Sequence, residues 1–365
     1  MRVAVVGCGR VSGHHCRSIA AAEGVELAAA CDLVPEKASN YGREFNVPWF
    51  TNYHEMFAKV PDIDIVAVIT PSGMHFEHAT EIMRLYRKNI VMEKPTFMRP
   101  SQLREAFTLA ESLGLHLFPV FQNRYNKAVQ RVRKSLQDGE LGEIRIASVR
   151  VRWCRPQRYY NLAPWRGTYG HDGGALTNQG IHHVDLLRYL GGEVARVNAT
   201  MRTLGADIEV EDTVVATMTY GGKAVGALEV TTAARPDDFE ASLSLVCDKG
   251  LAQIGGIAVN ELQIFTPDPS ACKVWSEDFS GNVYGYGHGQ MYRDISNFFH
   301  QGARYPVSYD DCLKTIKLLH AFYRSDEKSS WVDVDSDEES SRLGRPNEKI
   351  AALYRTPLPV TTANA

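Results

Sequence analysis

The stretch VAVVGCGRVSG, Val3 to Gly13, decides the fold of this chain. Its apolar first half has the pattern of a buried strand, and the glycines that follow let the backbone turn tightly and approach a pyrophosphate. A helical pattern comes next, and the free amides at its start form a site for anions. The following apolar run, 25–31, ends at Asp32, where a carboxylate can hold the ribose hydroxyls of adenosine. Together these features predict a Rossmann domain that binds a dinucleotide.

Asp32 also indicates which dinucleotide binds. A carboxylate at this position repels the 2′-phosphate of NADP, so NAD is the expected cofactor. Lys37 and Arg43 follow closely in the sequence and soften that repulsion. The preference for NAD therefore depends on how near these two cations come to the ribose.

Strand and helix patterns alternate as far as residue 121. Predicted strands cover 63–69, 89–92 and 116–121, and predicted helices cover 35–44, 52–58, 75–86 and 101–113. This alternation is typical of a doubly wound parallel sheet, which binds ligands at the carboxyl ends of its strands. Polar residues follow each of the three strands, as Thr70-Pro71-Ser72, Glu93-Lys94-Pro95 and Gln122-Asn123-Arg124-Tyr125. Lys94 is the candidate for chemistry, and the alternative is an ordinary solvated lysine.

The pattern changes near residue 143, where long alternating strands replace the helices. Strands are predicted at 144–153, 194–203, 212–220, 224–231, 241–247, 251–254 and 261–265, and helices at 126–137, 289–301 and 309–324. Such strands form a largely antiparallel open sheet, so the fold class is α/β with an α+β second domain. We expect the domains to be 1–122 for the dinucleotide, 123–325 for substrate and oligomerisation, and 326–365 as an acidic, partly flexible tail.

A second informative stretch is DGGALTNQGIHHVDLLRYL, Asp172 to Leu190. If it forms one helix, Asn178, His182 and Asp185 share a face at positions i, i+4 and i+7. An imidazole, an amide and a carboxylate would then point into one cleft while the apolar face covers the sheet. The alternative is a core helix in which His182 only satisfies a hydrogen bond.

Composition narrows the classes of partner. The chain has a net charge of −3 and no arginine-rich run, which argues against nucleic acid and favours a small molecule. Its seven cysteines are scattered and never spaced as CxxC, so we expect reduced thiols, no metal site and a cytoplasmic protein. The amino terminus enters a strand at once, and no apolar run is long enough for a membrane span.

Four motifs together resemble the Gfo/Idh/MocA family of oxidoreductases, which includes glucose-fructose oxidoreductase and inositol dehydrogenase. They are Gly7-Cys8-Gly9-Arg10, Thr70-Pro71-Ser72 with His75, Glu93-Lys94-Pro95, and Gly180-Ile181-His182-His183-Val184-Asp185. The resemblance implies a Rossmann domain and an open sheet that forms dimers or tetramers. It also implies that Lys94 and His182 are the catalytic residues. Many members have an aspartate four residues before the histidine, where this chain has Asn178.

A finer resemblance is carried by Tyr159-Tyr160, Trp165-Arg166-Gly167-Thr168 and Asn178-Gln179-Gly180. These residues are similar to the bacterial nucleotide-sugar branch of the family. That branch implies oxidation of the C3 hydroxyl of UDP-N-acetylglucosaminuronate for surface polysaccharide such as O-antigen, with 2-oxoglutarate recycling the NADH. Interleaved arginines and aromatic rings suit a pyrophosphate or carboxylate next to a ring, although such runs also occur as plain surface structure.

The predicted site is therefore as follows. Residues expected to bind the cofactor are Gly7, Gly9, Arg10, Val11, Asp32, Thr70, Pro71, His75, Glu93, Lys94, Gln122, Trp165 and Arg166. Residues expected to bind the substrate are Lys94, Asn123, Arg155, Tyr159, Tyr160, Asn178, Gln179 and His182.

The chemistry that these residues suit is hydride transfer from a carbinol carbon to nicotinamide. His182 is the expected base because an imidazole titrates near neutral pH, and the Lys94 ammonium then stabilises charge on the same oxygen. The reverse assignment stays open, since a neighbouring cation lowers the pKa of a lysine. Two other functions also stay open: an inositol or free-sugar dehydrogenase, and a non-catalytic regulatory protein that responds to a dinucleotide.

Overall fold

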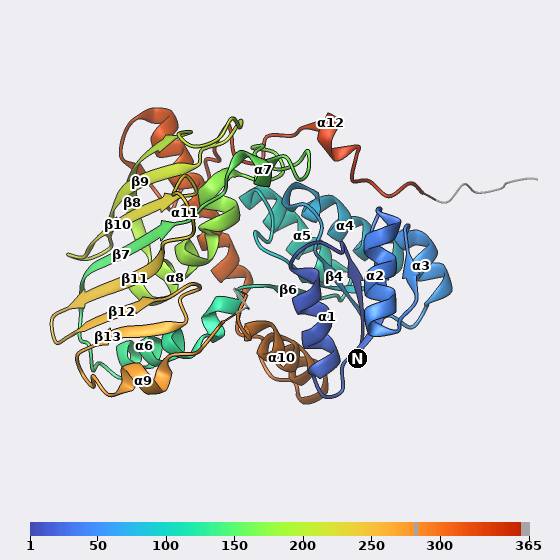
Figure 1. Cartoon of the computed structure of the whole chain (residues 1–365), viewed down its shortest axis with the longest axis horizontal. Coiled ribbons are helices and arrows are strands. Elements are labelled where there is room, and N and C mark those ends of the chain that lie inside the picture. The colour runs from blue at the N-terminus through green and yellow to red at the C-terminus, as the bar shows by residue number, and fades with distance from the viewer. Residues whose placement is uncertain (281–283, 359–365) are drawn as a thin grey trace, which may run out of the picture.

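The computed structural model describes residues 1–280 and 284–358, and it places them in two parts that each contain one sheet (Figure 1). The N-terminal sheet has the strand order β3-β2-β1-β4-β5-β6, and the C-terminal sheet has the order β13-β12-β11-β7-β10-β9-β8-β14. The predicted α/β class, with a Rossmann sheet followed by a largely antiparallel open sheet, is confirmed.

All strands of the N-terminal sheet are parallel. They are β1 (Arg2–Val6), β2 (Glu26–Cys31), β3 (Trp49–Phe50), β4 (Ile65–Val68), β5 (Asn89–Met92) and β6 (Leu117–Pro119). They are flanked by α1 (Ser12–Ala21), α2 (Pro35–Phe45), α3 (Tyr53–Lys59), η1 (Ser72–Met74), α4 (His75–Tyr86) and α5 (Pro100–Ser112). The strand order reverses between β1 and β4, and this reversal opens a crevice at the carboxyl ends where ligands of such sheets bind.

Gly7 shows why the turn after β1 needs glycine. Its φ is +98°, and a Cβ there would lie 2.5 Å from the carbonyl oxygen of Ile69. A side chain would therefore be strained and would also push β1 away from the end of β4. The Oγ of Ser12 closes the same turn by donating to the Gly7 carbonyl at 2.6 Å.

The C-terminal sheet is antiparallel except where β10 runs parallel to β7. Its strands are β7 (Ile144–Arg152), β8 (Val194–Arg202), β9 (Thr213–Tyr220), β10 (Val225–Thr231), β11 (Glu240–Cys247), β12 (Leu251–Gly255), β13 (Glu261–Phe265) and β14 (Val332–Asp333). Buried and exposed residues alternate along β8, β9 and β10, as expected for a sheet with one solvated face. In Figure 1 the helices lie between this sheet and the Rossmann domain, so the other face is open.

The helices of the second part connect it to the first. They are η2 (Gln122–Tyr125), α6 (Lys127–Gln137), α7 (Gln157–Tyr160), η3 (Ala175–Gln179), α8 (Ile181–Gly191), α9 (Ala271–Trp275), α10 (Gly287–Gln301), α11 (Tyr309–Lys328) and α12 (Glu348–Ala351). As predicted, the helices that follow the sheet return to the first domain, with α10 against α1 and α11 against α5. No helix within the described residues is both long and apolar enough to cross a membrane.

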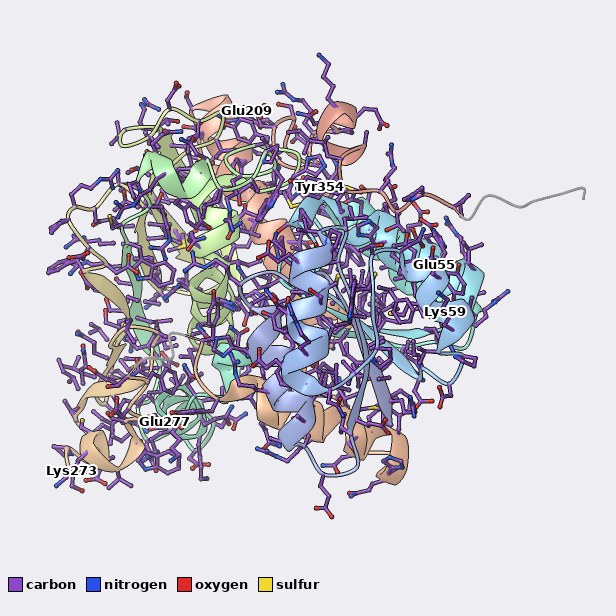
Figure 2. The ribbon with its side chains drawn as sticks, turned by 45° about the vertical axis from the view of Figure 1, so that its right-hand side comes forward. Glu55, Lys59, Glu209, Lys273, Glu277 and Tyr354 are labelled. Carbon is purple, nitrogen blue, oxygen red and sulfur yellow. The ribbon has the colours of Figure 1, made fainter. Side chains whose placement is uncertain are left out.

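The expectation of a partly flexible acidic tail is wrong for residues 326–358. α11 continues to Lys328, β14 pairs with β8, and Leu343 is buried. The acidic side chains bind cations of the folded body, such as Glu339 with Arg99 at 2.6 Å. Further on, the tail crosses to the Rossmann domain, where the Tyr354 carbonyl lies 3.1 Å from His78 Nε2 of α4 (Figure 2). The expected tail residues 359–365 lie outside the described part of the chain, and the domain boundary at residue 122 stays a prediction.

Candidate active site

Lys94 lies where the chain leaves β5, at the carboxyl edge of the parallel sheet. Its Nζ donates to the backbone carbonyl of Asn178 at 2.8 Å, which links the Rossmann domain to the second domain. Its backbone amide donates to Glu93 Oε2 at 3.0 Å. Burial lowers the pKa of the Lys94 ammonium, while the carboxylates of Glu93 and Asp172 oppose that shift.

His182 lies in the first turn of α8 and is 9% exposed. Its Nε2 is 3.2 Å from Gln122 Nε2, and its Nδ1 has no partner among the described residues. Burial, and then the charge of Lys94, hold the pKa of His182 well below its usual value. The imidazole is therefore neutral at neutral pH, which is the state a general base requires.

The predicted single helix over 172–190 is wrong, because the chain forms a π-helical turn, η3, before α8. Glu211 holds this turn: its carbonyl accepts from Ala175 N at 3.0 Å, and its Oε1 accepts from Leu176 N at 3.1 Å. Extra backbone turns of this kind are frequent at functional sites. Asn178 and His182 consequently do not share one helical face, but both lie beside Lys94.

Glu211 gives this support an expected dependence on pH. Burial raises the pKa of Glu211 to about 8, whereas in the unfolded chain the group ionises near 4.5. The folded state thus keeps a proton that the unfolded state loses, so stability falls as pH rises from about 4.5 to about 8. We expect Glu211→Gln to raise the free energy of unfolding at pH 8 by on the order of 3 kcal/mol and to change it little at pH 4.5.

Urea denaturation at the two pH values measures this effect. The control is Glu209→Gln, a more exposed carboxylate nearby on the same loop, for which we expect a change of about 0.5 kcal/mol or less. Equal responses of the two variants to pH would contradict the assignment.

Asp185 does not point into one cleft with His182, although the sequence predicts one shared helical face. Its Oδ2 and Oδ1 accept from Arg124 Nε and Nη2, both at 2.7 Å, and both residues are buried. The Oγ1 of Thr315 donates to the same carboxylate at 3.1 Å. With its acceptors occupied in this way, Asp185 joins α8 to η2 and is a structural residue.

Removal of this buried partner is expected to be costly. Asp185→Asn leaves the Arg124 guanidinium without its bidentate carboxylate, and we expect a loss of ~3 kcal/mol in the free energy of unfolding. The control is Asp138→Asn, which breaks the exposed pair of Asp138 with Lys134 and should cost ~0.5 kcal/mol. Urea denaturation of both variants measures the difference, and similar losses would show that the buried pair has no special weight.

Arginines and tyrosines gather on the loop before η3. Arg166 Nη1 donates to Tyr159 Oη at 2.5 Å, and Gln179 Nε2 donates to the same oxygen at 3.0 Å. Arg155 also lies beside the Tyr159 ring, but its Nη1 is 2.8 Å from Asp238, which partly neutralises it. These cations lie close enough to Lys94 to lower the pKa of its ammonium further.

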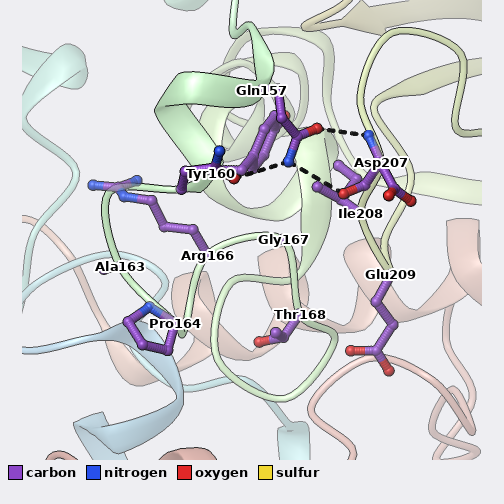
Figure 3. Close-up of a pocket in the computed structure, with 11 residues that line it drawn as sticks. Gln157, Tyr160, Ala163, Pro164, Arg166, Gly167, Thr168, Asp207, Ile208 and Glu209 are labelled. Atoms are coloured by element: carbon purple, nitrogen blue, oxygen red, sulfur yellow. Dashed lines mark hydrogen bonds between the residues drawn. The ribbon is translucent and has the colours of Figure 1, made fainter.

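Tyr160 packs against this cluster, with its ring centroid 5.2 Å from that of Tyr159. Its hydroxyl lies 3.0 Å from Thr232 Oγ1, and the side chain is buried. Tyr160 and Arg166 both line a groove of about 540 Å³ between α7 and the turn at Asp207, where Asp207 N donates to Gln157 Oε1 at 2.7 Å (Figure 3). The hydroxyl of Tyr160 is engaged within the second domain, and direct contact of Tyr160 with the substrate stays a prediction.

Most residues expected to bind the cofactor follow the carboxyl ends of β1, β2, β4 and β5. Asp32 Oδ2 accepts from Cys8 N at 2.7 Å and Oδ1 accepts from Val34 N at 2.8 Å, which orients the carboxylate at the end of β2. Gly9, Arg10 and Val11 are at least partly accessible at the start of α1. Space at the glycine turn and an oriented carboxylate fit a dinucleotide with a free ribose.

The remaining predicted residues divide into three groups. Thr70, Pro71 and Trp165 are partly exposed around the crevice. Gln122 is buried next to His182, and Asn123, which is expected to bind the substrate, is also buried. His75 is buried, with Nδ1 2.8 Å from the Pro95 carbonyl and Nε2 3.0 Å from the Thr70 carbonyl. Its ring therefore connects the turn after β4 to the turn after β5. Direct contact of these residues with the cofactor, or of Asn123 with the substrate, stays a prediction.

The sequence did not point to a histidine cluster behind Lys94. His15 Nε2 lies 3.0 Å from Glu93 Oε1, and His288 Nε2 lies 3.6 Å from the same oxygen. Burial alone would raise the pKa of Glu93, but the hydrogen bonds and charge of the two histidines hold it well below its usual range. Tyr292 Oη, at 2.8 Å from His15 Nδ1, completes the support. The cluster therefore fixes the Glu93 carboxylate that holds the Lys94 amide.

Comparison with known proteins agrees with this geometry. Residues 1–121 match the oxidoreductase family with an NAD-binding Rossmann fold, and residues 129–253 match the GFO/IDH/MocA C-terminal domain. The WlbA dehydrogenase from Bordetella pertussis, solved with NADH and UDP-GlcNAcA, is 33% identical, with a TM-score of 0.84 over 91% of this chain and 97% of that chain. The WlbA dehydrogenase from Chromobacterium violaceum, solved with the same ligands, is 34% identical, with a TM-score of 0.82 over 91% and 95%.

A more distant relative is the levoglucosan dehydrogenase of Pseudarthrobacter phenanthrenivorans, which is 24% identical over 82% of this chain and 87% of its own length. The two matched regions together span most of the chain, and the geometry of both domains fits them. The chain therefore belongs to the GFO/IDH/MocA family of oxidoreductases, and its N-terminal domain is an NAD-binding Rossmann fold.

Proposed function

We propose that this chain uses NAD to oxidise the C3 hydroxyl of UDP-N-acetylglucosaminuronate to a ketone. The observation that carries the proposal is the convergence of Lys94, His182 and the Arg166–Tyr159 pair at one crevice beside the NAD-binding edge. A proton acceptor and an ammonium suit a carbinol, and the arginine suits a carboxylate or pyrophosphate. The two WlbA enzymes, which hold this nucleotide sugar, support the choice of substrate.

The residues of the chain have distinct tasks in this reaction. NAD, when bound, accepts hydride from the carbinol carbon. His182 takes the hydroxyl proton, which becomes acidic as hydride leaves. Lys94 donates a hydrogen bond to the same oxygen and stabilises its negative charge. Gln122 fixes the tautomer of the His182 imidazole. With the Gln122 amide turned over, its Oε1, which has no partner within the described residues, accepts from His182 Nε2–H. The lone pair of His182 Nδ1 then stays free to accept a proton.

Two further parts of the proposal concern partners. The open sheet face exposes apolar side chains such as Val215, Val225 and Ile264, which suits contact between subunits in a dimer or tetramer. 2-Oxoglutarate is the proposed acceptor that returns NADH to NAD without release of the cofactor. In this proposal the oligomer and the reaction with 2-oxoglutarate serve the synthesis of surface polysaccharide.

The experiment is product analysis by mass spectrometry after incubation with UDP-N-acetylglucosaminuronate, NAD and 2-oxoglutarate. We expect a nucleotide sugar lighter by the mass of two hydrogens, together with 2-hydroxyglutarate. A sugar that stays unchanged, with protein shown to bind NAD, would overturn the substrate and direct the search to inositols and free sugars. Lack of NAD binding would instead favour a non-catalytic protein.

A further inference from the structure

A chain of hydrogen bonds connects Asp172 to Arg166 along the substrate side of the crevice. Asn178 Nδ2 donates to Asp172 Oδ1. Asn178 Oδ1 accepts from Gln179 Nε2 at 2.8 Å. The same Nε2 donates to Tyr159 Oη at 3.0 Å, and that oxygen also accepts from Arg166 Nη1 at 2.5 Å. Five side chains from two segments of the second domain therefore form one connected path.

The two ends of this path are chemically opposite. An ionised carboxylate only accepts hydrogen bonds, and a guanidinium only donates them. Asp172 is held further by Gly167 N, which donates to its Oδ2 at 2.7 Å. Because both ends are fixed, the amides of Asn178 and Gln179 each have one orientation that satisfies their neighbours. The Asp172 carboxylate thus determines which atom of Asn178 faces the crevice.

This orientation leaves two groups free for a ligand. Asn178 Oδ1 uses one lone pair for Gln179 and has a second one available. Tyr159 Oη accepts two hydrogen bonds, so its own hydrogen is left to donate. Lys94 Nζ is next to these groups because it donates to the Asn178 carbonyl. The crevice therefore offers an acceptor for a hydroxyl and donors for an oxygen acceptor.

We propose that Asp172 is a positioning residue that directs this hydrogen-bonded path and thereby selects a sugar acid with a hydroxyl donor near a carboxylate acceptor. The inference rests on the proposed function and specifies how the sugar is recognised. It also accounts for Asn178, which replaces the aspartate common in the family, because Asp172 supplies the carboxylate from behind it. Asn178 in turn contacts the sugar as an amide of fixed orientation.

The surroundings of Asp172 agree with this role. The side chain is 2% exposed, and the charged groups that face it are Arg166 and Lys94. The titratable hydroxyls of Tyr159 and Tyr160 are also near it and are uncharged at neutral pH, because burial raises the pKa of each. Burial raises the pKa of Asp172 to about 6, so lowering the pH through about 6 protonates the carboxylate at this end of the path. A protonated carboxyl can donate as well as accept, and the direction of the path is then lost.

Exchange of the two side chains gives a sharp test. In Asp172→Asn, the side chain at position 172 has one amide oxygen in place of two carboxylate oxygens. Gly167 N and Asn178 Nδ2 both need an acceptor there, so one of them is left without a hydrogen bond. In Asn178→Asp, two carboxylates face each other. In the double variant Asp172→Asn/Asn178→Asp, the amide oxygen introduced at position 172 accepts from Gly167 N. The amide nitrogen at that position donates to the carboxylate introduced at position 178, which also accepts from Gln179. Every donor along the path then has an acceptor again, although the hydrogen bond between positions 172 and 178 runs in the opposite direction.

We expect each single variant to raise the KM for UDP-N-acetylglucosaminuronate by about 10- to 100-fold with kcat changed less than about threefold. The double variant should return KM to within about threefold of the unaltered protein. The Kd for NADH should be the same in all forms, and Asn161→Asp, which adds a carboxylate to an exposed position of the same loop, is the matched control. In the unaltered protein, KM should rise as pH falls through about 6, and this rise should be absent in Asp172→Asn.

A second readout does not depend on the sugar. In ¹⁵N spectra of the NADH complex, the side-chain amide protons of Asn178 and Gln179 should exchange slowly and should exchange faster in Asp172→Asn. In the double variant, which has no amide at position 178, the Gln179 amide protons should exchange slowly again. Normal KM in Asp172→Asn, or a double variant no better than the singles in both readouts, would overturn the inference. If the unaltered protein fails to oxidise this sugar while the amide protons behave as expected, the proposed substrate is wrong and the path stands.

Discussion

Replacement of Lys94 by methionine is expected to lower kcat by on the order of a thousandfold while the Kd for NADH changes little. Methionine keeps the length and apolar body of the side chain but removes the ammonium that we propose to lie beside the reacting oxygen. Loss of one donor to a developing oxyanion costs about 10²–10³ in kcat in other enzymes, and Lys94 also supplies a full charge in a buried site. Steady-state kinetics with the nucleotide sugar, together with NADH fluorescence titration, measure the two quantities.

The matched control is Lys88→Met, which removes the lysine at the opposite end of β5. Lys88 Nζ donates to the Pro61 carbonyl at 3.1 Å, away from the crevice, so kcat should stay within about twofold. Because Lys94 also joins the two domains through the Asn178 carbonyl, thermal unfolding of the methionine variant has to be compared. A loss of kcat explained by partial unfolding, or a variant with nearly full activity, would contradict the role of the ammonium.

The Rossmann half could be predicted almost completely from local signals. Gly7 and Asp32 lie at the ends of neighbouring parallel strands, and short apolar runs between helical patterns leave few alternatives to a doubly wound sheet. Lys94 could be placed for the same reason, since it follows a strand whose carboxyl end lies at that edge. β3 and η1 were missed because elements of two or three residues have no periodicity to detect.

The arrangement around His182 could not be predicted, because contacts distant in the sequence determine it. A spacing of seven residues places Asp185 beside His182 only in an uninterrupted helix, and the π-helical turn is held by Glu211 from another loop. The partner of Asp185, Arg124, lies on η2. Asp172 was visible in the motif, but its contact with Asn178 depends on how the chain folds back after Gly174.

The acidic tail illustrates a different limit. Composition alone favours exposed and irregular structure for a run rich in serine and acidic residues. The run instead packs along α5 and α11, where Asp335 lies 2.9 Å from Lys317 and Glu339 lies 2.6 Å from Arg99. The cations that balance it belong to other segments, so a window of sequence cannot reveal them.

Replacement of His182 by asparagine is expected to lower kcat by about 10²–10⁴-fold and to change the shape of its pH profile. The pKa of His182 is held well below 6.5 by burial and by the charge of Lys94, so the unaltered enzyme keeps a neutral base throughout the neutral range. Its kcat should therefore be flat above pH 6.5 and fall only on further acidification, when the imidazole takes up a proton. Asparagine cannot accept that proton, so this acid limb should disappear.

His183→Asn is the control that shows whether the acid limb of kcat comes from the His182 ring. His183 is the next residue of α8 and is also buried, but its ring packs against Trp153 with centroids 5.6 Å apart, and burial lowers its pKa to about 4. Its replacement should leave the acid limb of kcat in place. If instead the limb persists in His182→Asn and disappears in Lys94→Met, Lys94 is the base and the roles are exchanged. The effect of Asp172 protonation can be distinguished from the titration of either candidate base. Asp172 protonation changes KM, whereas loss of the base changes kcat at saturating sugar.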